Sequence, residues 1–115
     1  MILSVVKIMP YPDKWKEVID TLLSMKGPTR VSCGCLDCTV AMEHDDLSRI
    51  VYIEQWRSWE DLHCHIRSKI YVRLLEALEL SLETPEVSFF EISVEKGMEV
   101  IEAERDPDSA QDFVH

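Results

Sequence analysis

The sequence predicts a single domain of the α+β class, in which helices pack on an antiparallel sheet. Strand-like and helical segments follow one another in the order β-α-β-β-α-β, and the 115 residues suffice for one modest hydrophobic core. The apolar runs are too short to cross a bilayer, so we expect no contact with the membrane interior.

Residues 2–9 are mostly apolar or β-branched and predict the first strand. Pro10 and Pro12 end it, and proline is also favoured in the first turn of a helix. Apolar residues then recur at the i, i+3, i+4, i+7, i+8 spacing of an amphipathic helix, which we expect Gly27 and Pro28 to stop. These apolar residues are Trp15, Val18, Ile19, Leu22 and Leu23.

Residues 34–43 and 49–56 predict two strands joined by a polar turn, which makes a hairpin. Ser58 followed by Asp61 predicts a helix start near Trp59, because the serine can cap the first turn. We expect a register break at residues 68–71, so this helical region divides into two pieces and ends before Thr84 and Pro85. The apolar stripe of the second piece is Tyr71, Leu74, Leu75, Leu78 and Leu82.

Residues 87–95 predict a fourth strand, after which Gly97 turns the chain into an apolar stretch, residues 98–103. That stretch could be an edge strand or an arm. The domain is expected to span residues 1–103, and residues 104–115 form an acidic, polar tail that we expect to be disordered. The complete order is the ferredoxin-like, split βαβ arrangement.

The strands carry apolar side chains at both odd and even positions, most clearly in residues 2–9 and 49–56. A small sheet with helices on one side only should alternate apolar and polar residues. We therefore expect a homodimer in which a second copy covers the other face. The alternative is a monomer whose helices divide between the two faces.

Charge and cysteine content restrict the environment and the partners. The formal net charge is −10, and the resulting field opposes binding to phosphate backbones, so nucleic acid is an unexpected partner. Four cysteines, with a strand beginning directly after Met1 and no room for a signal peptide, predict a cytoplasmic protein with free thiols.

The run from Glu54 to Leu62, followed by His65 and Ser68, resembles the antibiotic biosynthesis monooxygenase family. The shared pattern is a strand ending in Glu-x-Trp, a helix entered through a small polar residue, and a histidine on its inner side. The resemblance extends over about residues 1–95 because the flanking elements agree in order and length.

This resemblance implies a dimeric α+β barrel with a pocket between sheet and helices in each subunit. It further implies a monooxygenase without metal or other cofactor that acts on a small aromatic or quinol-like molecule. The haem-degrading branch is disfavoured, since the chain contains no asparagine and lacks the histidine of the last helix. Ile70 also replaces a histidine common in the family.

The resemblance implies catalytic roles for Trp56 and His65. The indole N–H of Trp56 could hold a substrate oxygen, and His65 could take a proton near neutral pH. Tyr52, four residues before Trp56 on the same strand face, and Tyr71 are candidates for substrate binding. In the alternative interpretation Trp56 and Tyr52 are core residues and His65 is a satisfied, semi-buried histidine. A second hypothesis for the function is a non-catalytic binding or regulatory module that holds a small hydrophobic ligand in the same pocket.

The cysteines suggest a separate zinc or redox site. They form a C-x-C-x-x-C run with a further cysteine between two histidines: Cys33, Cys35, Cys38, His63, Cys64 and His65. Thiolates and imidazoles are good zinc ligands, but the spacing is not that of a paired C-x-x-C site. In a regular strand Cys35 and Cys38 would also point to opposite faces, so we predict no metal site and leave redox sensing open.

Overall fold

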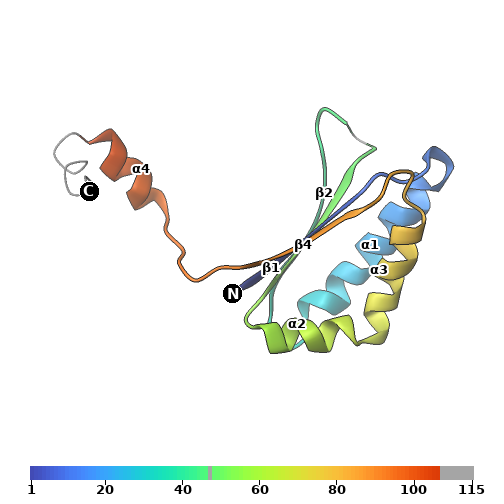
Figure 1. Ribbon diagram of the computed structural model, residues 1–115, viewed down its shortest axis with the longest axis horizontal. Coiled ribbons are helices and arrows are strands. Elements are labelled where there is room, and N and C mark those ends of the chain that lie inside the picture. The colour runs from blue at the N-terminus through green and yellow to red at the C-terminus, as the bar shows by residue number, and fades with distance from the viewer. Residues whose placement is uncertain (47, 107–115) are drawn as a thin grey trace.

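A four-stranded antiparallel sheet with the strand order β2-β3-β1-β4 organises the chain (Figure 1). The computed structural model describes residues 1–46 and 48–106. Its elements are β1 (Ile2–Ile8), the 3-10 turn η1 (Pro12–Lys14), α1 (Trp15–Arg30), β2 (Cys35–Met42), β3 (Ile50–Trp56), α2 (Trp59–Ile66), α3 (Lys69–Glu79), β4 (Glu86–Glu91) and α4 (Met98–Arg105). The expected α+β, ferredoxin-like order is confirmed, as are the β2–β3 hairpin and the division of the second helical region.

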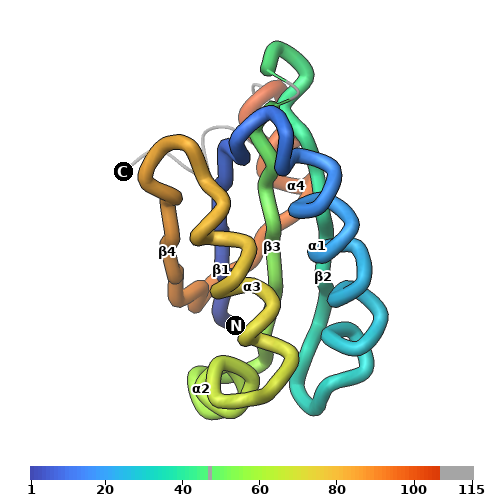
Figure 2. Tube along the Cα trace, turned by 90° about the vertical axis from the view of Figure 1, so that its right-hand side faces the viewer, coloured from blue at the N-terminus to red at the C-terminus, as the bar shows by residue number. Residues whose placement is uncertain are grey.

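Three helices lie on one face of the sheet, with α1 and α3 side by side across it (Figures 1 and 2). The core forms between this face and the helices, and its buried members include Val6, Leu22, Ile50, Tyr52 and Leu74. Within the described residues, α4 projects away from the sheet and no helix packs on the opposite face. The helices therefore do not divide between the two faces.

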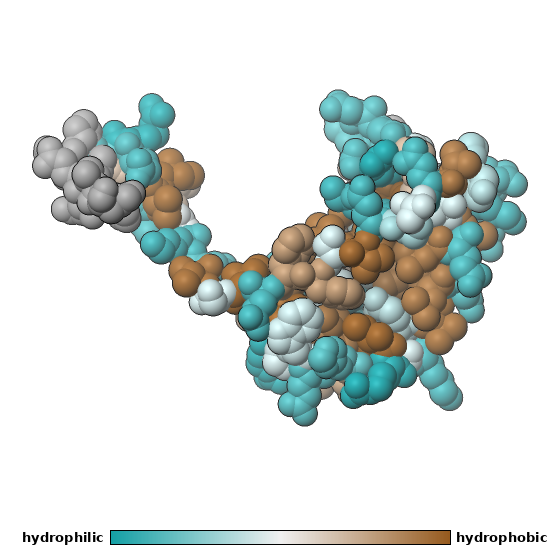
Figure 3. All heavy atoms as spheres, in the orientation of Figure 1, coloured by the Kyte–Doolittle hydropathy of each residue, from teal (hydrophilic) through white to brown (hydrophobic). Residues whose placement is uncertain are grey.

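The uncovered face of the sheet carries a cluster of apolar residues among polar ones. Residues directly opposite each other in an antiparallel pair share a face, so Val5 and Ile53 lie together, as do Leu3 and Phe90. We call this surface the open face and define it by Leu3, Val5, Ala41, Val51, Ile53 and Phe90. Apolar residues are also visible along the extended segment that leads to α4 (Figure 3).

Helix α1 continues through Pro28 to Arg30, so the prediction that Gly27 and Pro28 stop it is wrong. Proline removes one backbone hydrogen bond, but the turn beyond it is held by packing, since Thr29 is fully buried against the sheet. Ser32 also donates a side-chain hydrogen bond to the Pro28 carbonyl, at 2.9 Å. Burial of the last turn outweighs the local helix-breaking tendency.

Helix α3 ends at Glu79, five residues before Thr84. The chain then turns to pair with the residues after β1, with the Leu82 N–H donating to the Met9 carbonyl at 2.6 Å. Leu82 and Leu75, predicted on the buried stripe, are exposed, and so is Leu23 of α1. Ala77 and Met25 occupy buried positions instead.

Residues 98–103 belong to a helical arm, and the alternative of an edge strand is wrong. Methionine, glutamate and alanine favour helix, and the Glu99 carboxylate accepts a 2.8 Å hydrogen bond from the Gly97 N–H at its start. This bond lowers the pKa of Glu99. Helix α4 includes residues 104 and 105 of the expected tail, and residues 107–115 lie outside the described residues. Among the described helices, none is both long and apolar enough to cross a membrane.

Candidate functional site

A cavity of about 260 Å³ opens at the end of the sheet where β3 runs into α2. Its walls come from the α1–β2 connection, the last residue of β3, helix α2 and the beginning of α3. The lining residues are Ser32, Cys33, Trp56, Glu60, Asp61, Cys64, His65, Ser68 and Ile70. Trp56 and His65, the two predicted catalytic residues, therefore face one cavity.

Local sequence fixes how α2 leaves β3. Ser58 is extended and caps the helix, accepting from the Asp61 N–H at 3.2 Å and donating to the Asp61 carboxylate at 3.0 Å. The predicted start at Trp59 is confirmed. Since only two residues separate Trp56 from the helix, α2 folds back at once and brings His65 over the indole ring, with the ring centroids 4.6 Å apart.

Glu54 lies at the centre of the site and joins the two predicted catalytic residues. Its Oε1 accepts the indole N–H of Trp56 at 3.0 Å, and its Oε2 lies 3.0 Å from His65 Nε2. Glu54 and Trp56 are two residues apart in a strand and hence point to the same face. Glu54 is 0% exposed, so this carboxylate is removed from water with its two oxygens engaged.

The Trp56 N–H is thus held inside the protein, which differs from the expectation that it binds a substrate oxygen. Trp56 lines the cavity but is itself 0% exposed. His65 is 4% exposed and carries its Nε2 toward Glu54, leaving Nδ1 as the other ring nitrogen.

Tyr71 and Tyr52 take different places. The Tyr71 ring packs edge-on against the His65 imidazole, with the ring centroids 5.4 Å apart, and does not line the cavity. Burial, reinforced by the negative charge of Glu54, raises the pKa of Tyr71 to about 12. Tyr52 lies in the core, where its hydroxyl accepts from the Cys38 thiol at 3.3 Å and lies 3.5 Å from the Thr29 hydroxyl. Burial, then Glu54, raises the Tyr52 pKa as well.

The structure therefore brings together Trp56, His65 and Tyr71 and leaves Tyr52 apart. Glu54 was not predicted as a site residue, although it occurs in the Glu-x-Trp pattern. One sequence signal was available: in β3 it shares the parity of Ile50, Tyr52 and Trp56, which are all buried. A carboxylate at a buried strand position needs partners of its own.

The cysteines are arranged differently from the expectation. A β-bulge between Cys35 and Asp37 shifts the register, so that Cys35 pairs with Trp56 and Cys38 with Glu54. Both thiols consequently point to the helix-covered face rather than to opposite faces. Burial raises the pKa of both, that of Cys38 to about 11. Within residues 1–46 and 48–106, no three His, Cys, Asp or Glu side chains are arranged to hold a metal ion.

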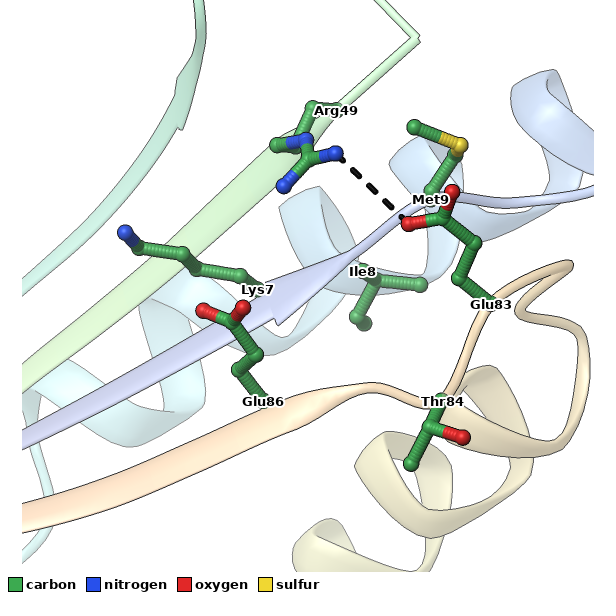
Figure 4. A pocket seen from close by; sticks show the side chains of 7 residues that line it. All are labelled: Lys7, Ile8, Met9, Arg49, Glu83, Thr84 and Glu86. Carbon is green, nitrogen blue, oxygen red and sulfur yellow. Dashed lines mark ion pairs between the residues drawn. The ribbon is translucent and has the colours of Figure 1, made fainter.

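Two other hollows lie near the opposite end of the sheet. One holds about 20 Å³ and is charged; its Arg49 guanidinium lies 3.6 Å from the Glu83 carboxylate (Figure 4). This volume is too small for an aromatic molecule. The other is a groove of about 320 Å³ lined by Met9, Pro10, Pro12, Trp15, Ser48 and Leu82. Neither combines room for a ligand with an acid–base group, as the Trp56 cavity does.

Comparison with known proteins finds solved structures that share the fold. Rv0793 from Mycobacterium tuberculosis is 25% identical, with a TM-score of 0.76 over 84% of this chain and 98% of that one. A protein from Methanosarcina mazei Go1 is also 25% identical, with a TM-score of 0.73 over 80% of this chain and 92% of its own.

An antibiotic biosynthesis monooxygenase at 18% identity shares the fold, with a TM-score of 0.73 over 82% of this chain and 100% of that one. Among curated proteins none matches the chain. The family model for antibiotic biosynthesis monooxygenase matches residues 1–77, which include β1, the α1 helix, the hairpin, α2 and most of α3. The chain therefore belongs to the antibiotic biosynthesis monooxygenase family.

Proposed function

We propose that this protein is a cofactor-independent monooxygenase that oxidises a small aromatic, quinol-like molecule in the Trp56 cavity. One observation carries the proposal: a buried carboxylate, Glu54, links an indole and an imidazole that both face a cavity of about 260 Å³. That volume lies near the lower end of the range for small-molecule pockets and suits a compound of two or three fused rings.

The first step is removal of a phenolic proton. With Nε2–H donating to Glu54, a neutral His65 has Nδ1 as its basic nitrogen. The imidazolium formed when Nδ1 takes the proton lies beside the Glu54 carboxylate, so the charge separation is stabilised where it arises. The hydrogen bond from the Trp56 N–H to the other Glu54 oxygen fixes the orientation of the carboxylate.

The second step is reduction of dioxygen by the substrate anion. The anion is electron-rich and transfers electrons to O₂, one oxygen atom enters the ring system, and the other leaves as water. A quinol thereby becomes a hydroxyquinone, and the two electrons and two protons it gives up complete the water. The protein supplies the base, a ring surface and shelter from solvent.

Oxygen uptake against a panel of naphthoquinols and anthrones tests the proposal. We expect protein-dependent uptake that falls by roughly 10²-fold or more in His65→Ala, the range typical of a lost general base. His63→Ala is the matched control, because His63 is an exposed histidine of the same helix that does not line the cavity. Trp56→Phe keeps a ring but releases Glu54, and we expect an intermediate loss.

A non-catalytic module that binds a small hydrophobic ligand is the competing function. Saturable binding of the same compounds, with oxygen uptake no faster than with heat-denatured protein, would establish that function instead. Equal oxygen uptake by wild type and His65→Ala would still indicate an oxygenase but would show that His65 is not its base.

We also infer that the working form is a homodimer whose open faces pack together. Ile53 and Val5 lie at the centre of that face, and an apolar surface of several strands favours association. The expected result by sedimentation equilibrium is twice the 13.4 kDa chain mass. Ile53→Glu should give a folded monomer by circular dichroism, whereas Leu23→Lys, on the outer side of α1, should leave the mass unchanged. A monomeric wild type would contradict the inference.

We expect this dimer to work in the cytoplasm. Its four cysteines are free thiols, the state that a reducing compartment preserves.

A further inference from the structure

Two thiols that the proposed reaction does not use stand at the cavity. Cys33, in the α1–β2 connection, and Cys64, on α2, both line it and are both exposed. They lie 31 positions apart in sequence, so the fold brings them to one place. The other two cysteines face the core, where burial raises the pKa of each thiol.

Cys33 and Cys64 each lie next to a residue of the cavity region. The Arg57 guanidinium lies 4.0 Å from Cys33 Sγ, the distance of a long, weak hydrogen bond. Cys64 directly precedes His65, the proposed base. Soft nucleophiles thus flank a cavity that Trp56 and His65 also line.

We propose that Cys33 and Cys64 form a covalent modification site for quinone-type electrophiles bound in the Trp56 cavity. The inference builds on the proposed function in one respect, since oxidation of a quinol leaves a quinone beside these thiols. It extends that function by assigning to the site a second ligand chemistry, thioether formation with an oxidised ring.

The chemistry needs no further reactant. The thiolate sulfur attacks a ring carbon that bears hydrogen, a C–S bond forms, and the electron pair of the ring C=C bond moves to the conjugated oxygen. Two protons complete the change: the one given up by the thiol and the one lost from the attacked carbon both end on the ring oxygens. The ring becomes an aromatic hydroquinone thioether, reduced by two electrons at the expense of the new bond.

Binding distinguishes this site from ordinary exposed cysteines. A quinone held in the cavity reacts with a nearby sulfur as a unimolecular step, which raises the rate above that of random collision. The attached ring also occupies the cavity, so modification closes the site to further substrate. An oxidised product that lingers would therefore shut off its own formation.

The test supplies 1,4-naphthoquinone directly to the full-length protein under anaerobic conditions and follows adducts by intact mass and peptide mapping. We expect the adduct on Cys33 or Cys64, at a rate that saturates with quinone concentration and falls when 1-naphthol competes. Cys35 and Cys38 should stay unmodified until the protein is unfolded.

The matched control is Ser24→Cys in a Cys33→Ser, Cys64→Ser background. Position 24 is exposed on α1, away from the cavity, and its side-chain oxygen lies 3.4 Å from the Arg73 guanidinium. A cysteine at position 24 would therefore be an exposed thiol beside an arginine, like Cys33, but with no cavity next to it. We expect this thiol to react at least about tenfold more slowly, without saturation and without protection by 1-naphthol.

Equal, non-saturating rates at position 24 and at the native thiols would overturn the proposal, because exposure alone would then explain the reaction. Since the quinone is supplied and oxygen is absent, the result does not depend on monooxygenase activity. Saturable adduct formation in a protein that consumes no oxygen would support the thiol site and reject the oxygenase. Oxygen uptake together with non-saturating adduct formation would support the oxygenase and reject the thiol site.

Discussion

The two ends of strand β3 hold charged groups in opposite ways. At one end, Arg49 lies near Glu43, Asp46 and Glu83 at 3.6 to 4.0 Å, and all four side chains are at least partly exposed to water. At the other, Glu54 is buried with His65 at 3.0 Å, and their side chains are 1% and 2% exposed. The first arrangement is a screened surface network, whereas the second is a desolvated pair beside a cavity. Only the second can hold a base for chemistry away from water.

Glu54→Leu should change the unfolding free energy more than any other substitution considered. Removing the carboxylate leaves the Trp56 and His65 N–H groups buried without an acceptor, and we expect a loss of roughly 3 kcal/mol in unfolding free energy, measured with urea. Glu83→Leu at the exposed end is the control and should change stability by less than about 0.5 kcal/mol. Similar losses in the two variants would mean that burial does not separate the two ends.

Gly34→Ala, at the cavity end of the sheet, should cause the next largest loss of stability. Gly34 has a φ of 82°, and an added Cβ would clash with the Asp61 side chain, so backbone strain and a steric clash combine. We expect a loss of about 2 kcal/mol by urea denaturation. Gly27→Ala, in helix α1 with nothing within 4 Å of its added Cβ, should instead stabilise the protein by up to about 1 kcal/mol. If both substitutions acted in the same direction, the strain at Gly34 would be unsupported.

Alkaline pH should test the buried end further, because burial, reinforced by the charge of Glu54, raises the pKa of both Cys38 and Tyr71. The Cys38 pKa rises from 9.0 to about 11 on folding, and that of Tyr71 from 10.0 to about 12. Between these values the unfolded chain releases protons that the folded chain keeps, so stability is complete below pH about 9 and falls from there to about 12.

We expect stability, measured from the urea midpoint, to drop between pH 8 and pH 10.5 by roughly 2 to 3 kcal/mol, with reductant present. Cys38→Ala should lower stability at every pH but flatten the slope above pH 9. A variant that lost stability with the same slope as wild type would show that Cys38 does not carry the effect.

Arg49→Ala should give the smallest change. Its ion pairs are exposed, so we expect less than about 0.5 kcal/mol at low salt and no difference from wild type in 1 M salt. A salt-independent loss above 1 kcal/mol would mean that this end is held as tightly as the Glu54 end.

The order of the elements was predictable because it depends on local patterns. The Pro10 and Pro12 boundary, the Ser58 cap and the break before Lys69 each follow from a few neighbouring residues. Pro28 shows where such patterns fail, since the buried Thr29 keeps the last turn of α1 helical. Packing partners distant in sequence decided that boundary.

The sequence by itself determined an α+β domain of this family, with Trp56 and His65 on elements that meet. Periodicity and the Glu-x-Trp pattern are enough for that. Only the tertiary structure decided that Glu54 joins them, that Tyr52 belongs to the core, and that Cys33 and Cys64 share one cavity. Those outcomes depend on contacts between residues far apart in the chain and on a one-residue bulge in β2, neither of which a local pattern encodes.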